Sequence, residues 1–168
     1  MTSRAAHRSE HDSRGVSADS EVSRGTRAAR LAGGLTVAAG ALAVLAATFL
    51  PVLRIEIAGR VRSEFDRTGW DLHGPALVLL ALAALALLIG ALRGSLPAAL
   101  AVDACGLAVL GFAVIGDLPD VGTRDLVESV FTIGTARAGS GAQAEVVGGV
   151  LLLLGGGILG FAAWSAAD

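Results

Sequence analysis

The chain has 168 residues, of which 54% are hydrophobic and 17% are charged, and its formal net charge is −2. Soluble domains carry roughly 25% charged residues, which form a polar face on each surface helix, so this composition predicts a membrane protein instead of a soluble one. The near-neutral charge gives no electrostatic basis for binding nucleic acid.

The N-terminal tail, residues 1–30, is polar and contains Arg, Ser and acidic residues without apolar periodicity. It cannot bury enough apolar surface to offset the entropy of ordering, so we predict a disordered tail. His7 and His11 stand four residues apart beside two acids, but a disordered segment fixes no ligand geometry. A metal site in the tail is therefore disfavoured.

The first apolar segment, residues 31–53, is long enough for a transmembrane helix, which needs about 20 apolar residues. A secretory signal is the alternative, because Arg residues precede the segment. The segment is longer than a typical signal core and three more apolar segments follow it. A retained transmembrane helix is the favoured interpretation.

The loop over residues 54–74 alternates apolar and charged side chains on both sides of Ala58-Gly59. This alternation predicts a short β-hairpin in the first extracellular loop. Trp70 precedes the second apolar segment, where an interfacial aromatic anchor belongs.

The second and third apolar segments, residues 75–92 and 96–115, are joined only by Arg93-Gly94-Ser95. So short a link requires two antiparallel helices. In the acidic loop that follows, residues 125–133 place their apolar side chains on one side of a predicted short helix, and the Gly- and Ala-rich remainder has no core-forming pattern.

The fourth apolar segment, residues 146–164, is rich in glycine. Gly149, Gly156 and Gly160 fall on one helical face, and small residues allow close approach of helix backbones in lipid. The predicted fold is therefore all-α: residues 31–166 form an antiparallel bundle of four transmembrane helices.

An even number of helices places both chain ends on one side of the membrane. The Arg residues divide almost equally between the two sides, so the positive-inside rule gives little discrimination. Moving the Arg-rich tail across the membrane is unfavourable, and the acidic loop is easier to export. We therefore predict a protein of the cell membrane with both termini in the cytoplasm.

Asp103 is the one carboxylate within the four predicted helices. An intramembrane acid is costly and indicates a proton or cation site by default. Arg93 ends the preceding helix on the same side, so a structural Asp103–Arg93 pair is the favoured interpretation. A water-exposed acid near the interface and a transport role are the alternatives.

No catalytic or cofactor-binding motif such as GxSxG, a Walker loop, HExxH or CxxC occurs in the chain. His73 has no cysteine or serine partner nearby in the sequence. The pattern therefore predicts no enzyme, no cofactor and no metal site.

Several short features occur together: Phe49-Leu50-Pro51, Gly69-Trp70, the tight helical hairpin, an Asp117-to-Asp120 turn and a Gly-rich last segment. In this combination the chain resembles small four-span integral membrane proteins of actinobacteria. The resemblance implies the topology and no activity. The chain is also loosely similar to claudin-type four-span proteins, but it lacks their paired loop cysteines.

Two functions are consistent with these patterns. The first is a non-enzymatic structural or interaction component of the membrane, which contacts lipid and assembles with itself or another membrane protein. The glycine face of the fourth helix supports it, although the same face would also serve packing within the bundle. The second is a small transporter or channel subunit using Asp103. It ranks lower because a transporter is expected to have more polar residues in mid-helix and often repeated halves, whereas this chain has one acid and no clear internal repeat.

Overall fold

A computed structural model describes the backbone of residues 6–57, 60–61, 63, 66–117, 121, 124–127 and 132–166, and the side chains from residue 25 onward except those of 124–133. The helices are α1 (Ala6–Phe49), α2 (Gly69–His73), α3 (Ala76–Leu92), α4 (Leu96–Gly111), the π-helical turn η2 (Phe112–Asp117) and α5 (Ser140–Trp164). The strands are β1 (Pro51–Ile57), β2 (Arg60–Val61), β3 (Arg67–Thr68), β4 (Arg124–Val127) and β5 (Thr132–Ala138).

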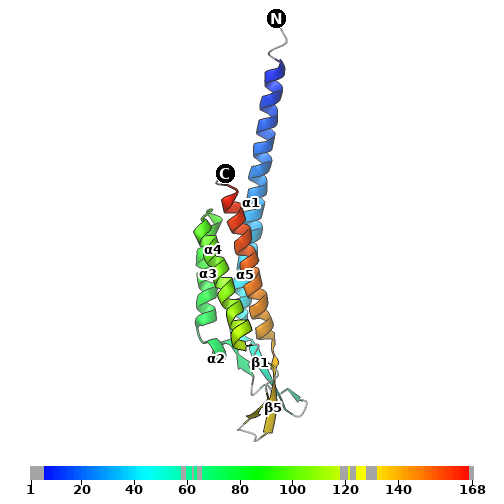
Figure 1. Ribbon diagram of the computed structural model, residues 1–168, viewed down its shortest axis with the longest axis vertical. Coiled ribbons are helices and arrows are strands. Elements are labelled where there is room, and N and C mark those ends of the chain that lie inside the picture. Colours follow the sequence, from blue (N-terminus) through cyan, green and yellow to red (C-terminus); the bar gives the residue numbers. More distant parts are fainter. Residues whose placement is uncertain are drawn as a thin grey trace.

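The four longest helices form a bundle in which each packs on the next along the chain and α5 returns to α1. Figure 1 shows that α1 begins and α5 ends on one side of this bundle, while the sheet lies on the other. Most of the fully buried side chains are apolar and come from all four helices, including Val37, Leu77, Val102, Leu152 and Leu159. The predicted helical bundle is confirmed in this architecture.

Reciprocal glycine contacts bring the helices close together. A Cβ added to Gly155 would lie 2.9 Å from the Gly33 carbonyl oxygen, and one added to Gly33 would lie 3.1 Å from that of Gly155. Gly40 and Gly148 form a second such pair, also between α1 and α5. Distances this short are rarely or never seen for a real Cβ, so glycine at these positions allows the close approach of the backbones.

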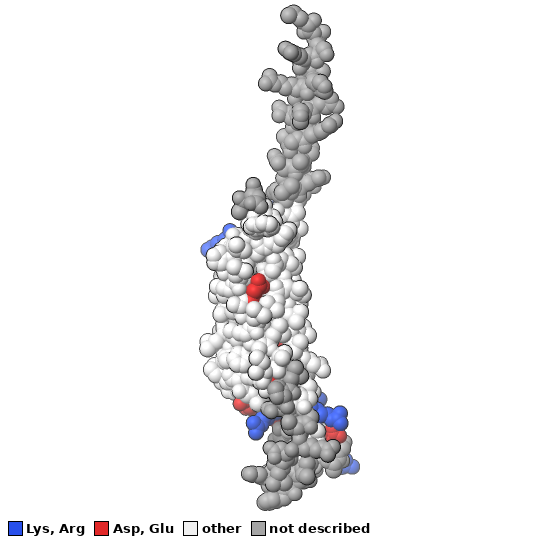
Figure 2. All heavy atoms as spheres, in the orientation of Figure 1, with Lys and Arg blue, Asp and Glu red and all other residues white. Residues whose placement is uncertain are grey.

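Three helical segments are long and apolar enough to cross a membrane: Gly25–Phe49, Leu96–Asp117 and Ser140–Trp164. Helix α3 is also apolar but has 17 residues, which extend about 26 Å at about 1.5 Å per residue. The face drawn in Figure 2 has a broad, largely uncharged band with an acidic patch within it. The large exposed side chains of these helices are mostly Leu, Ile, Val and Phe, as lipid contact requires.

The observed helix ends differ from the predicted ones at both ends of the bundle. The first apolar helix ends at Phe49, because Pro51 begins a strand in place of a last helical turn. Helix α5 begins at Ser140, six residues before the predicted start at residue 146. The tail predicted as disordered over residues 1–30 is helical from Ala6 onward, since extending an existing helix avoids the cost of nucleation.

The strands form one sheet of order β2-β1-β5-β4, with β3 also paired to β1. The hairpin predicted in the first loop is confirmed, with Glu56 opposite Val61 and Ile57 opposite Arg60. The short helix predicted over residues 125–133 is wrong in its described parts, because residues 124–127 pair with 132–135 as antiparallel strands. Residues 128–131 lie outside the described part. Residues 134–138, in which the sequence shows no core-forming pattern, form part of strand β5 and pair with β1 and β4.

The sheet continues directly from two helices of the bundle. Strand β1 begins two residues after α1 ends, β5 ends two residues before α5 begins, and the two strands pair with each other. At this junction the Gly139 N–H donates to the Val52 carbonyl oxygen at 2.7 Å. A Cβ on Gly141 would lie 2.7 Å from the Leu50 carbonyl oxygen, so glycine is required where α5 meets the end of α1. The sheet is therefore fixed to the bundle through α1 and α5.

Candidate functional site

Three ionisable side chains meet at the end of the bundle nearest the sheet. His73 Nε2 lies 3.0 Å from Asp117 Oδ1 and 3.7 Å from Glu145 Oε1. One donor atom from each of the three residues lies within 4.8 Å of the other two. Their side chains are 7%, 4% and 0% exposed, respectively. The cluster is therefore shielded from bulk solvent.

His73 is positioned by the short helix α2, which three local features hold in place. The Thr68 side chain caps its start, and the Asp71 carboxylate accepts hydrogen bonds from the Thr68 N–H at 2.9 Å and from the Thr68 hydroxyl at 2.7 Å. These bonds, the backbone one foremost, hold the pKa of Asp71 below its ordinary value. Gly74, at φ 55°, ends the helix with its N–H donating to Trp70.

Helix α2 also docks directly on the end of α1. A Cβ on Gly69 would lie 2.7 Å from the Ala47 carbonyl oxygen, so the backbone of α2 sits closer to α1 than any side chain would permit. This contact fixes the helix that carries His73 against the bundle. The His73 ring then packs on Phe112, with ring centroids 5.1 Å apart.

Asp117 is the last residue of the π-helical turn η2, which follows α4. The wider turn changes the direction in which successive side chains point, and such turns are often found at functional sites. Val114 and Ile115 are exposed while Asp117 is buried. The turn thus directs an acidic side chain into the protein at the end of an apolar helix.

Glu145 lies in the second turn of α5 and is fully buried. Neither of its carboxylate oxygens has a hydrogen-bond partner within the described part of the chain. Buried polar groups are normally paired, because desolvation without a compensating bond is costly. A proton or a cation at the cluster would compensate this carboxyl group.

The sequence-predicted pair of Asp103 and Arg93 is not formed in the structure. Asp103 Oδ1 is buried without a hydrogen-bond partner, and Arg93 is exposed at the end of α3. Asp103 instead lies over Gly156, whose missing side chain leaves the space that the carboxylate occupies. The acid therefore belongs to the seam between α4 and α5 and not to an ion pair.

The predicted glycine face of α5 lies inside the bundle. A Cβ on Gly149 would lie 2.8 Å from the Leu110 side chain, and one on Gly156 would lie 3.1 Å from the Ala99 carbonyl oxygen. Gly160 has ordinary contacts with Leu96 and Ala99. This face packs on α4, so it is occupied within one copy of the chain.

The His73–Asp117–Glu145 cluster was missed by sequence reasoning, which treated each residue as part of a loop. One available signal was topology: His73 precedes the second apolar segment, Asp117 follows the third and Glu145 precedes the fourth. In an antiparallel arrangement these three positions reach the same end of the bundle. Their burial could not be read from the sequence, because it depends on the π-helical turn and on the early start of α5.

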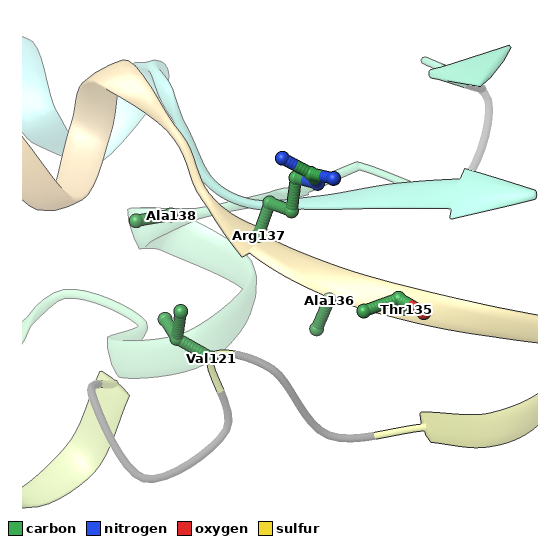
Figure 3. Close-up of a pocket in the computed structure, with 5 residues that line it drawn as sticks. All are labelled: Val121, Thr135, Ala136, Arg137 and Ala138. Atoms are coloured by element: carbon green, nitrogen blue, oxygen red, sulfur yellow. The ribbon is translucent and has the colours of Figure 1, made fainter. Parts of the chain in front are cut away.

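A second feature near the sheet is an open concavity beside β5, lined by Val121, Thr135, Ala136, Arg137 and Ala138 (Figure 3). Among the described residues that line it, Arg137 is the charged one, and it forms an ion pair with Glu56 on the neighbouring strand β1. With its cation already paired and its other walls made by small side chains, the concavity offers few groups for recognising a ligand.

No protein-family model, curated protein or solved structure matches this chain.

Proposed function

We propose that the protein is a four-span protein of the cell membrane, without catalytic activity, that acts as an interaction component. In this proposal α3 is the fourth span, both termini lie in the cytoplasm, and the sheet stands at the outer surface. The sheet is the part that contacts a partner, which is another membrane-associated protein or a second copy of the chain.

The observation that carries the proposal is the attachment of the sheet to α1 and α5. Strands β1 and β5 continue these helices, and the Gly139–Val52 hydrogen bond and the Gly141 contact join them at the membrane surface. Among the described strands, β2 and β4 lie at the ends of the sheet order. Strands at a sheet edge have free backbone groups that can pair with an added strand.

The positions of the α5 glycines also favour the sheet over the helices as the surface that contacts a partner. Within α5, Gly148 and Gly155 are covered by α1, and Gly149 and Gly156 are covered by α4. The remaining helix surface is rich in large apolar side chains, which suit lipid. The sheet is thus the more suitable surface for a protein partner.

The test is photocrosslinking in intact cells with a photoreactive amino acid at Val61, an edge residue of β2 that is 55% exposed. The matched control carries the same probe at Leu107, a residue of α4 that is 61% exposed on the apolar band. We expect a discrete protein adduct from position 61 and none from position 107. An adduct of twice the chain mass identifies a second copy as the partner. Lipid adducts alone from both positions would contradict the proposal.

The rival function, a small transporter or channel subunit, is supported by the unpaired Asp103 oxygen. A conduction path needs further polar groups along the bundle. The buried polar or charged residues of the described part are Thr48, Asp117 and Glu145. Asp117 lies 14 residues beyond Asp103, about 20 Å along the helix, so Asp103 lacks a continuous polar neighbourhood. This function remains the second proposal.

A further inference from the structure

We propose that His73, Asp117 and Glu145 bind a divalent transition-metal cation, and that Zn²⁺ is the ion that fits them best. The inference is independent of the partner proposed for the sheet. It rests on the types of donor atom, on the distances between them, and on the buried Glu145 carboxylate, whose oxygens have no hydrogen-bond partner in the described part of the chain.

The donor types are those that zinc takes from proteins. Zinc binds imidazole nitrogen at about 2.0–2.1 Å and carboxylate oxygen at about 2.0–2.2 Å, usually with tetrahedral geometry. Ca²⁺ needs six to eight oxygen ligands, which three side chains do not supply. Of the common divalent ions, zinc also binds such nitrogen and oxygen sites more tightly than Mn²⁺ or Fe²⁺.

The spacing agrees with one shared ion. Ligands bound at about 2.05 Å at the corners of a tetrahedron are about 3.3 Å apart. His73 Nε2 lies 3.0 Å from Asp117 Oδ1 and 3.7 Å from Glu145 Oε1, one distance on each side of this value. Because all three donors lie within 4.8 Å of one another, side-chain rotations could bring them around one ion, with a fourth position left for water or another ligand.

Glu145 supplies the independent evidence. It is fully buried, and both its oxygens lack a hydrogen-bond partner while lying beside the other two donors. Two carboxylates and a neutral imidazole together carry two negative charges, which one divalent cation neutralises. Such an ion would compensate a buried carboxylate whose oxygens have no hydrogen-bond partner in the described part of the chain.

The site joins parts of the chain that are far apart in sequence. His73 comes from α2, Asp117 from η2 and Glu145 from α5. A bound ion would therefore link the connection between α1 and α3, the connection between α4 and β4, and the first part of helix α5. It would close the bundle at the surface from which the sheet extends.

The experiment measures Zn²⁺ binding by calorimetry to the full chain in nanodiscs, after chelation and purification with a tag that lacks histidine. All forms carry His7→Ala and His11→Ala, so that tail histidines contribute nothing. Glu145→Gln and His73→Gln remove one ligand each without a large change of volume. Asp103→Asn is the matched control, because it neutralises an unpaired carboxylate outside the cluster.

We expect one zinc per chain in the background form and in Asp103→Asn, with a loss of at least about tenfold in affinity in both cluster variants. Absent stoichiometric binding, or unchanged binding in both cluster variants, would overturn the proposal. Co²⁺ added to the background form provides a readout that does not depend on whether the variants fold. Intense visible absorption of four-coordinate cobalt, removed by added Zn²⁺, supports the site, whereas the weak spectrum of aqueous cobalt contradicts it.

Discussion

Asp103 and Glu145 are both acids within the apolar helices, but their surroundings differ. Asp103 occupies the space above Gly156 and is partly exposed. Glu145 is fully buried beside His73 and Asp117. Burial together with convergent donors, and not the mere presence of an acid in an apolar segment, distinguishes a binding site from a tolerated charge.

The absence of an Asp103–Arg93 ion pair leads to a prediction on stability. In a double-mutant cycle of Asp103→Asn and Arg93→Gln, we expect a coupling energy within about 0.5 kcal/mol of zero, as for residues that do not interact. Breaking a buried pair through one partner would instead cost about 3–5 kcal/mol. Unfolding in mixed detergent micelles measures the free energy of unfolding of the unmodified chain, the two single variants and the double variant. A coupling above about 1 kcal/mol would show that the pair forms.

At the scale of elements, α5 is the helix around which the others pack. Its Gly148 and Gly155 approach α1, while Gly149 and Gly156 approach α4. In each adjacent pair, Gly148-Gly149 and Gly155-Gly156, the first glycine contacts α1 and the second contacts α4. This arrangement explains why one helix contains so many glycines, although each lowers intrinsic helix stability in water.

Neighbouring glycines of α5 provide a matched comparison. A Cβ at Gly155 would lie 2.6 Å from the Val37 side chain and 2.8 Å from the Val37 backbone nitrogen, whereas one at Gly157 meets nothing within 4 Å. We expect Gly155→Ala to lower the free energy of unfolding by about 1–3 kcal/mol through overpacking. Gly157→Ala should leave it unchanged or raise it by up to about 1 kcal/mol. Both are measured by the same detergent titration, and equal effects would contradict the packing described for α5.

The sequence predicted the elements whose signal is long and uniform. The four apolar helices and their order follow from continuous apolar segments, and the β1–β2 hairpin follows from alternation on both sides of Ala58-Gly59. The strand β4 was predicted as part of a helix, because a short apolar segment fits either period and its pairing with β5 decides between them. The partners of the α5 glycines also required the structure, since a helix with small residues on two faces does not specify which neighbour each face meets.

The candidate site could be predicted less well than the fold. Glu145 and Asp117 lie at helix ends, and helix ends are the least certain part of a sequence prediction. Their burial follows from the six extra residues at the start of α5 and from the π-helical turn after α4. Neither feature has a residue pattern that distinguishes it from an ordinary interfacial loop.

At the scale of the whole molecule, one side holds the start of α1, the α3–α4 turn and the end of α5, and the other holds the sheet and the His73–Asp117–Glu145 cluster. The exposed apolar helix surface lies between them (Figure 2). This division suits a protein that crosses a membrane with distinct tasks on its two sides. The orientation and the crossing by α3 are the claims on which the proposed function depends.

Cysteine accessibility tests these claims most directly. In a Cys105→Ala background, which lacks cysteine, Val61→Cys, Arg93→Cys and Ser165→Cys each place one thiol at an exposed position: the sheet, the α3–α4 turn and the end of α5. With a membrane-impermeant maleimide, we expect labelling at position 61 in intact cells and at positions 93 and 165 only after permeabilisation. Labelling of positions 61 and 93 together in intact cells would show that α3 does not cross the membrane. Labelling of 93 and 165 without 61 would show the opposite orientation.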